Sequence, residues 1–238
     1  MTSLSDRFTA WMAEHDAVNP ATPAATVLAL RDGDDGPEIL MVKRNSKGTF
    51  ASNWVFPGGK VDPEDFAGDD DIVDASRRAA SREAFEEADL VVDESKLVPF
   101  SHWMPPTVIP RRFATWFYIT AAPEGVDGDV TIDGGEIVDH LWVTPADALA
   151  RHARGEVELV PPTWMTLTHL AAFRTTAEAI ATIQQREPFF YLTRMLTQDP
   201  PTVAWHDDVG YESGDPDTPG RRHRLVMTPG SWELVEPW

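Results

Sequence analysis

Residues 74–89 are rich in Ala, Arg and Glu and contain neither Pro nor Gly, a composition typical of a helix. Asp74 is a candidate N-cap of this helix, and Asp89 is a candidate end. Apolar runs rich in β-branched and aromatic residues lie on both sides of it: ATVLAL (25–30), EILMVK (38–43), 97–103, FATWFYIT (113–120) and IVDHLWV (137–143). A helix between such strands predicts an α/β or α+β domain, with a mixed sheet packed between helices.

Further segments extend this domain at both ends. A short amphipathic helix is expected near the N-terminus, and RDGDDGP between the first two apolar runs predicts a hairpin turn. Residues 145–154 and 163–184 have helical patterns, and another short helix is expected from 188 to 196. We therefore divide the chain into four parts: an N-terminal helix (1–20), the main domain (21–158), a helical extension (159–198) and a Pro/Gly/Asp-rich segment (199–238).

Charge and composition narrow the range of partners. The formal net charge of −19 argues against binding to nucleic acid or to anionic membranes, because both repel a negative protein. The chain has no Cys, which excludes disulfides, thiolate metal sites and Cys nucleophiles. No secretory signal or membrane-spanning run is recognised, so we expect a cytoplasmic protein. The oligomeric state stays open, with a homodimer as one option.

Three glutamates share one side of the predicted helix, in SREAFEEADL (81–90). At helical spacing Glu87 lies about 40° from Glu83, and Glu86 lies about 60° to the other side. A solvated acidic face would tolerate this, since each like-charge pair costs only about 0.2–0.5 kcal/mol. The alternative is a site for a hard divalent cation such as Mg²⁺ or Mn²⁺, which prefers oxygen ligands. The Gly58-Gly59 pair upstream favours the cation site, since glycines let the backbone approach a ligand closely.

FPGGKV followed by REAFEEADL resembles the signature of the Nudix hydrolases, G-x5-E-x7-R-E-U-x-E-E-x-G-U, in which U is aliphatic. In this match Gly59 is the first Gly, and Ala84 and Leu90 stand at U positions. The spacing from Gly59 to the R-E pair is longer than in the signature. Asp65 or Asp74 is the counterpart of the first Glu, and Asp89 stands where the signature has its second Gly.

The resemblance implies a Nudix-type α/β/α sandwich and a metal-dependent enzyme. Such enzymes hydrolyse the pyrophosphate bond of a nucleoside diphosphate linked to another group, with Mg²⁺ or Mn²⁺ as cofactor. On this basis Glu83, Glu86 and Glu87 bind the metal, and Arg82 orients Glu83. The general base is either Glu83 or Glu136. The backbone of Gly58 and Gly59 approaches the metal or the substrate.

Segments beyond the signature resemble the Nudix subgroup that contains the peroxisomal acyl-coenzyme-A diphosphatase, which also has an insertion in the signature. These segments are HWMPPTVIPRRFATWFYITAAP, GGEIVDHLWVTPADAL and LVPPTWMTLTHLAAF. The substrate implied is coenzyme A or acyl-coenzyme A. ADP-ribose or a nucleotide sugar is the alternative, and a Nudix-like module that binds a nucleotide without cleaving it is the non-enzymatic one.

Several side chains are candidates for contacts with this small diphosphate substrate. Arg44, Arg111 and Arg112 could supply positive charge, although the latter two would equally suit a solvated strand edge. Phe56 could stack on the substrate, as could Trp103, and core packing is the alternative for both rings. His102 and His140 are expected to have structural roles, because neither has a second His at metal-ligand spacing.

Overall fold

The computed structural model describes residue 4 and residues 20–47, 51–68, 71–123, 125–126, 130–132 and 134–236. Its main sheet has eight strands in the order β3-β2-β1-β6-β5-β8, with β4 paired to β1 and β7 paired to β2. The strands are β1 (Thr22–Gly33), β2 (Gly36–Arg44), β3 (Trp54–Val55), β4 (Gly58–Lys60), β5 (Val98–Met104), β6 (Phe113–Ala121), β7 (Ile137–Val143) and β8 (Phe189–Leu192). The predicted N-terminal helix lies outside the described residues, apart from residue 4.

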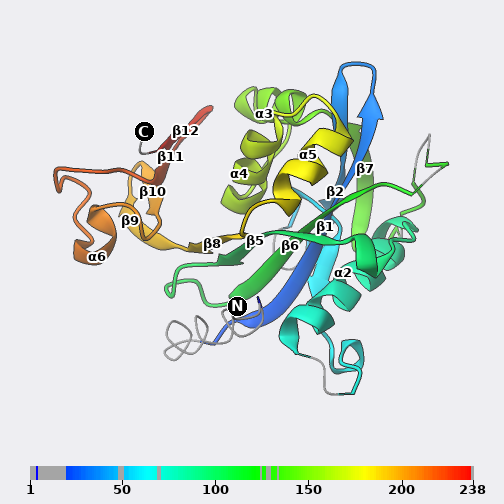
Figure 1. Cartoon of the computed structure of the whole chain (residues 1–238). Coiled ribbons are helices and arrows are strands. Elements are labelled where there is room, and N and C mark those ends of the chain that lie inside the picture. Colours follow the sequence, from blue (N-terminus) through cyan, green and yellow to red (C-terminus); the bar gives the residue numbers. More distant parts are fainter. Residues whose placement is uncertain are drawn as a thin grey trace.

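The sheet is mixed, and β1 lies near its centre (Figure 1). β1 pairs antiparallel with β2 through a turn at Gly33 and Gly36, which confirms the predicted hairpin, and parallel with β6. Successive side chains of a strand point to opposite faces. Leu28 and Leu30 therefore join the core on one face, while Val27 joins the core on the other.

Helix α2 (Ile72–Ala88) covers one face of the sheet (Figure 1). The alanines of this helix pack there, since Ala80, Ala84 and Ala88 are buried against the sheet. The predicted N-cap is wrong. Asp71, rather than Asp74, accepts hydrogen bonds from the first free N–H groups of the helix, and α2 begins one turn earlier than the side-chain pattern suggests.

Three helices cover the other face: α3 (Pro145–Ala153), α4 (Pro161–Leu170) and α5 (Thr176–Gln184) (Figure 1). The single helix predicted over 163–184 is therefore wrong, because the chain breaks it into α4 and α5. Thr175 caps α5 by accepting a hydrogen bond from the Glu178 N–H. Between α2 and β5, residues Glu94–Lys96 form the short 3-10 turn η2.

The C-terminal part contains strands where a helix and an irregular segment were expected. The helix predicted over 188–196 is wrong, since β8 adds to the main sheet beside β5. A second, four-stranded antiparallel sheet follows, with the short helix α6 (Gly210–Ser213) at its side: β9 (Arg194–Gln198), β10 (Pro201–Ala204), β11 (Arg224–Thr228) and β12 (Ser231–Val235). The predicted division into four parts stays a prediction. Within the described ranges, no helix is long and apolar enough to cross a membrane.

Candidate active site

The Gly58–Gly59 backbone of β4 forms the floor of the candidate site. It pairs with Thr26 and Ala25 of β1, and α2 lies directly against it. A Cβ atom on Gly58 would lie 2.4 Å from the Ala25 carbonyl oxygen, and one on Gly59 would lie 2.4 Å from the Cδ and Oε1 atoms of Glu83. Glycine at these positions therefore has two separate reasons: close strand pairing at Gly58 and room for a carboxylate at Gly59.

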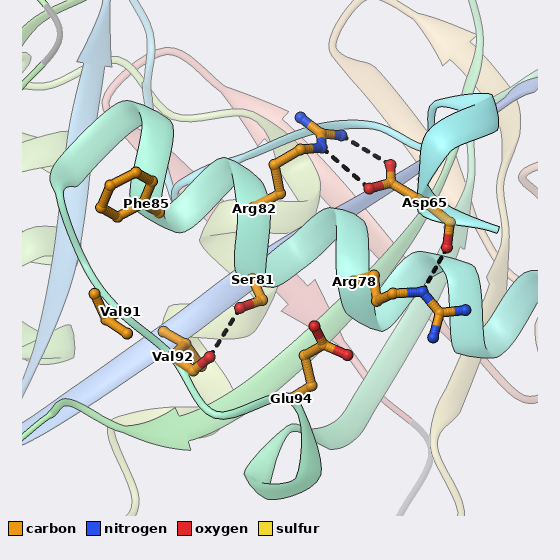
Figure 2. A pocket seen from close by; sticks show the side chains of 8 residues that line it. All are labelled: Asp65, Arg78, Ser81, Arg82, Phe85, Val91, Val92 and Glu94. Atoms are coloured by element: carbon orange, nitrogen blue, oxygen red, sulfur yellow. Dashed lines mark hydrogen bonds and ion pairs between the residues drawn. The ribbon is translucent and has the colours of Figure 1, made fainter. Parts of the chain in front are cut away.

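Arg82 connects the acidic groups around this floor. Its guanidinium donates to both carboxylate oxygens of Asp65, at 3.1 and 2.9 Å (Figure 2). It also donates to Glu83 at 2.7 Å, to Glu86 at 3.2 Å and to the Lys60 carbonyl oxygen at 3.0 Å. Arg82 thereby fixes the carboxylates of α2 relative to β4 and to the 3-10 turn η1 (Pro63–Asp65).

Asp65, one of the two candidate counterparts of the first signature Glu, lies beside Arg82 and binds it. Its side chain is buried, and one oxygen accepts a hydrogen bond from the Asp62 N–H at 2.8 Å. Burial alone would raise the pKa of Asp65, but the hydrogen bonds from Arg82 and from the Asp62 backbone outweigh it and lower the pKa. Asp65 therefore stays ionised as the permanent partner of Arg82.

Glu83 and Glu87 are held in an unfavourable electrostatic state. Burial raises the pKa of Glu83 despite the hydrogen bond from Arg82. Burial also raises the pKa of Glu87 to about 7, although the Gly58 N–H and Arg44 lower it; the charges of Glu83 and Glu136 add to the rise. One Glu87 oxygen accepts the Gly58 N–H at 2.9 Å. Each of the two carboxylates has one arginine partner, Arg82 for Glu83 and Arg44 for Glu87, where α2 meets the glycine floor.

Arg44, at the end of β2, joins Glu87 to Glu136. Its Nη1 lies 3.2 Å from Glu87 Oε1, and its Nη2 lies 2.5 Å from Glu136 Oε2. Glu136 precedes β7 and is largely exposed. The structure thus brings Arg44 and Glu136, which are far apart in sequence, to the same carboxylate cluster.

Asn45 is a residue of this site that sequence reasoning missed. Its side chain donates to the Gly135 carbonyl oxygen at 2.7 Å, and its backbone N–H donates to the Glu136 carbonyl oxygen at 2.8 Å. These bonds fix the loop that carries Glu136. The sequence does not predict these two hydrogen bonds, because they depend on the pairing of β2 with β7.

The donor set fits a hard divalent cation in its chemistry. Glu83, Glu86 and Glu87 supply carboxylate oxygens from one side of α2, two of them at a raised pKa that a cation would reverse. In the part of the chain that the structure describes, no three His, Cys, Asp or Glu side chains are already arranged to hold a metal ion. Arg82 and Arg44 hold these carboxylates as ion pairs instead, so a cation would have to share or replace those partners.

Other predicted site residues lie apart from this cluster. Arg112 is buried, and its Nε donates to the Pro105 carbonyl oxygen at 3.1 Å, so it braces its own hairpin loop; Arg111 is exposed on that loop. Phe56 is 3% exposed and packs edge-on against Phe117 at 6.3 Å, which is the core-packing alternative.

Trp103 and His102 also lie in the interior, whereas His140 on β7 is half-buried. Trp103 stacks on Tyr191 at 3.9 Å, which again is the packing alternative. His102 is fully buried, and burial lowers its pKa to about 3, so it stays neutral.

A hollow of about 380 Å³ flanks α2 on the side of the Arg82–Asp65 pair (Figure 2). Ser81, Phe85 and Val91 line it together with that pair. Glu83, Glu87 and Arg44 are not among its lining residues. The hollow therefore borders the candidate site and does not contain the carboxylates of Glu83 and Glu87.

The end of α2 accommodates the departure from the signature at Asp89. Asp89 adopts the left-handed conformation, with φ 51°, and its N–H donates to the Phe85 carbonyl oxygen at 2.8 Å. Asp tolerates this conformation better than most residues, although less well than Gly. Helix α2 therefore ends at Ala88, directly after Glu87, with Asp89 as its left-handed C-cap.

Comparisons with known proteins bear on the family of this chain. The family model described as NUDIX domain matches residues 20–163. The Caenorhabditis elegans protein named "Putative nudix hydrolase 7" is 30% identical over 171 residues, which cover 56% of this chain and 55% of that protein. The chain thus spans about half the length of the curated relative it matches.

One solved structure in particular shares the fold. The NUDIX hydrolase from Alicyclobacillus acidocaldarius matches with a TM-score of 0.61 and 23% identity, over 69% of this chain and 97% of that one. The NUDIX domain of Shewanella oneidensis NrtR, crystallised with ADP ribose, gives a TM-score of 0.49 and 16% identity, over 75% and 98% respectively. The family model covers more than half of the chain, and the α/β/α sandwich carries the glycine floor and the Arg82 cluster in place, so the chain belongs to the Nudix family.

Proposed function

We propose that this chain is a divalent-metal-dependent pyrophosphohydrolase that cleaves the pyrophosphate bond of a nucleoside diphosphate linked to another group. The observation that carries the proposal is geometric: the half-buried Glu83 and the buried Glu87 lie on one side of α2 against the Gly58–Gly59 backbone, where Glu87 accepts the Gly58 N–H at 2.9 Å and a Cβ on Gly59 would meet the Glu83 carboxylate. Carboxylates gathered beside a close-packed glycine backbone suit a hard divalent cation.

Each residue of the cluster has a role in this proposal. Glu83, Glu86 and Glu87 would hold Mg²⁺ or Mn²⁺, which when bound neutralises phosphate oxygens and activates water. Arg82 keeps Glu83 in place, and Asp65 keeps Arg82 in place. The Gly58 N–H fixes Glu87.

Of the two candidates for the general base, we favour Glu136. Each carboxylate has an arginine partner, but Glu136 is 68% exposed and therefore accessible to water, whereas Glu83 is only 16% exposed. A general base must reach the proton that it accepts. Replacing Glu136 with Gln should lower kcat more than it raises KM.

For the substrate, we propose coenzyme A or acyl-coenzyme A first, on the strength of the subgroup resemblance in the sequence. ADP-ribose and nucleotide sugars are the enzymatic alternatives. A binding module without catalysis is the other alternative. The left-handed Asp89 weakens the case for that module, since the helix end forms in spite of the substitution.

The test is metal-dependent turnover of a substrate panel. Purified protein is incubated with Mg²⁺ or Mn²⁺ and coenzyme A, acyl-coenzyme A, ADP-ribose, a nucleotide sugar or a dinucleoside polyphosphate, and products are identified by mass spectrometry. Glu86→Gln combined with Glu87→Gln should abolish turnover, while Glu94→Gln, an exposed position on η2, should not change it. Turnover of no panel member would favour the binding module, and equal turnover by the double variant would refute the ligand assignment.

A further inference from the structure

Arg44 is the one cation that the structure places between Glu87 of α2 and Glu136 of the β7 loop, among the described residues. Its side chain is 22% exposed, and that of Glu87 is 7% exposed. The Gly58 N–H already binds Glu87 Oε2, so Oε1 is the oxygen that faces Arg44. A metal ion would therefore compete with the Arg44 guanidinium for Glu87 Oε1.

We propose that Arg44 neutralises Glu87 and Glu136 in the metal-free protein and is displaced when a divalent cation binds Glu87, so that its guanidinium becomes a binding group for the substrate's phosphates. This inference rests on the proposed function and adds an order of events to it. The metal ion binds first. The Arg44 guanidinium that it displaces then becomes available to an anionic ligand.

The charges around Arg44 support an exchange of partners. Without Arg44, Glu87 would be a buried carboxylate surrounded by the charges of Glu83 and Glu136. A divalent cation supplies more positive charge to these groups than Arg44 does, and it repels the guanidinium. A released guanidinium can bind a phosphate with two parallel hydrogen bonds.

The loop geometry allows the exchange without local unfolding. Asn45 holds the backbone of Gly135 and Glu136 independently of the Arg44 side chain. Arg44 itself is anchored by its backbone pairing in β2. Only its side chain has to move, and Glu136 stays beside the site when it does.

Coupling of this kind is reciprocal, which gives a test that does not need turnover. Mn²⁺ affinity of the metal-free protein is measured by isothermal titration for wild type and for Arg44→Gln, Arg44→Lys and Arg151→Gln. Arg151 is the matched control, because it forms an ion pair with Asp147 on α3 and its replacement changes the net charge equally. We expect Arg44→Gln to bind Mn²⁺ about fivefold to tenfold more tightly than wild type, and the other two variants to bind it as wild type does.

A second titration follows the freed guanidinium. Inorganic pyrophosphate is titrated into each protein with and without saturating Mn²⁺. Wild type should bind pyrophosphate more tightly when Mn²⁺ is present. In Arg44→Gln, this increase in affinity should be about fivefold to tenfold smaller than in wild type. Thermal unfolding checks that Arg44→Gln is folded. If it is not, Arg44→Met takes its place in both titrations.

The outcomes separate this inference from the proposed function. Unchanged or weaker Mn²⁺ binding by Arg44→Gln overturns the inference even if the enzyme hydrolyses its substrate. An unchanged pyrophosphate gain in that variant also overturns it. Tighter Mn²⁺ binding and a reduced gain in a protein that turns over no substrate would support the inference and refute the proposed hydrolase.

Discussion

Replacing Gly59 with Ala should separate stability from activity. The new Cβ would lie 2.4 Å from Glu83 Cδ, whereas carbon atoms in contact normally lie about 3.5 Å apart, so the carboxylate must retreat by about 1 Å. A displacement of this size at an active site can cost about 100-fold in rate. We therefore expect kcat/KM to fall about 100-fold.

The fold should survive this change. The obstacle is the end of a flexible side chain, and a strained Glu83 rotamer costs about 0.5–1.5 kcal/mol. Loss of unfolded-state freedom at a Gly→Ala site offsets about 0.4–1 kcal/mol of that. The free energy of unfolding should change by less than about 1 kcal/mol, as measured by urea denaturation monitored by Trp fluorescence.

Two other glycines provide matched controls. Gly33 also faces a glutamate, with a Cβ 2.8 Å from Glu38 Cδ, but it lies in the β1–β2 hairpin; Gly33→Ala should leave kcat/KM unchanged. Gly58→Ala would meet the Ala25 backbone, which cannot move aside, and should destabilise the fold by about 1–3 kcal/mol. The reasoning is refuted if Gly59→Ala retains more than about a third of wild-type kcat/KM, or if it unfolds as easily as Gly58→Ala.

Three further changes test other parts of the structure. Asp208 is fully buried; burial alone would raise its pKa, but Arg224 and two backbone N–H groups lower it to about 2, below its ordinary 3.8. The lowered pKa of Asp208 contributes about 2 kcal/mol to the free energy of unfolding above pH 3.8, and this is lost as the pH falls through 2. The loss measured by urea denaturation across this range should therefore be about 2 kcal/mol smaller in Asp208→Asn, while carboxylates such as Asp65 keep their share. Asp65→Asn should lower kcat/KM about 10–100-fold in the same assay by loosening Arg82, with KM changing less than kcat. Asp89→Gly should raise the free energy of unfolding by about 1 kcal/mol without changing kcat, and a loss of stability would contradict the left-handed cap.

The sequence was sufficient to predict the helix that carries the carboxylates and the strands around it. Composition and periodicity are local properties, and α2, β1, β2, β5, β6 and β7 all follow them. The helix break was also recoverable, because Thr175 and Glu178 stand at the spacing of a capping box inside the segment predicted as one helix. The helical spacing of apolar residues before and after Thr175 nevertheless favoured one continuous helix.

The contacts that complete the candidate site were not predictable in the same way. Arg44 reaches Glu87 and Glu136 across 43 and 92 residues, and only the sheet order brings these side chains together. The choice between Asp65 and Asp74 likewise depends on how η1 folds back onto α2, because both residues fit the signature by counting. The residues of β8 alone do not distinguish a helix from a strand. They form a strand because they pair in parallel with β5.

Anomalous diffraction from crystals soaked in MnCl₂ tests the central claim most directly. We expect a manganese peak within coordination distance of Glu83, Glu86 and Glu87, beside the Gly58–Gly59 backbone, with Arg44 no longer bound to Glu87 Oε1. A protein that binds Mn²⁺ in solution but shows its peak elsewhere, with these carboxylates still paired to Arg82 and Arg44, would contradict the account.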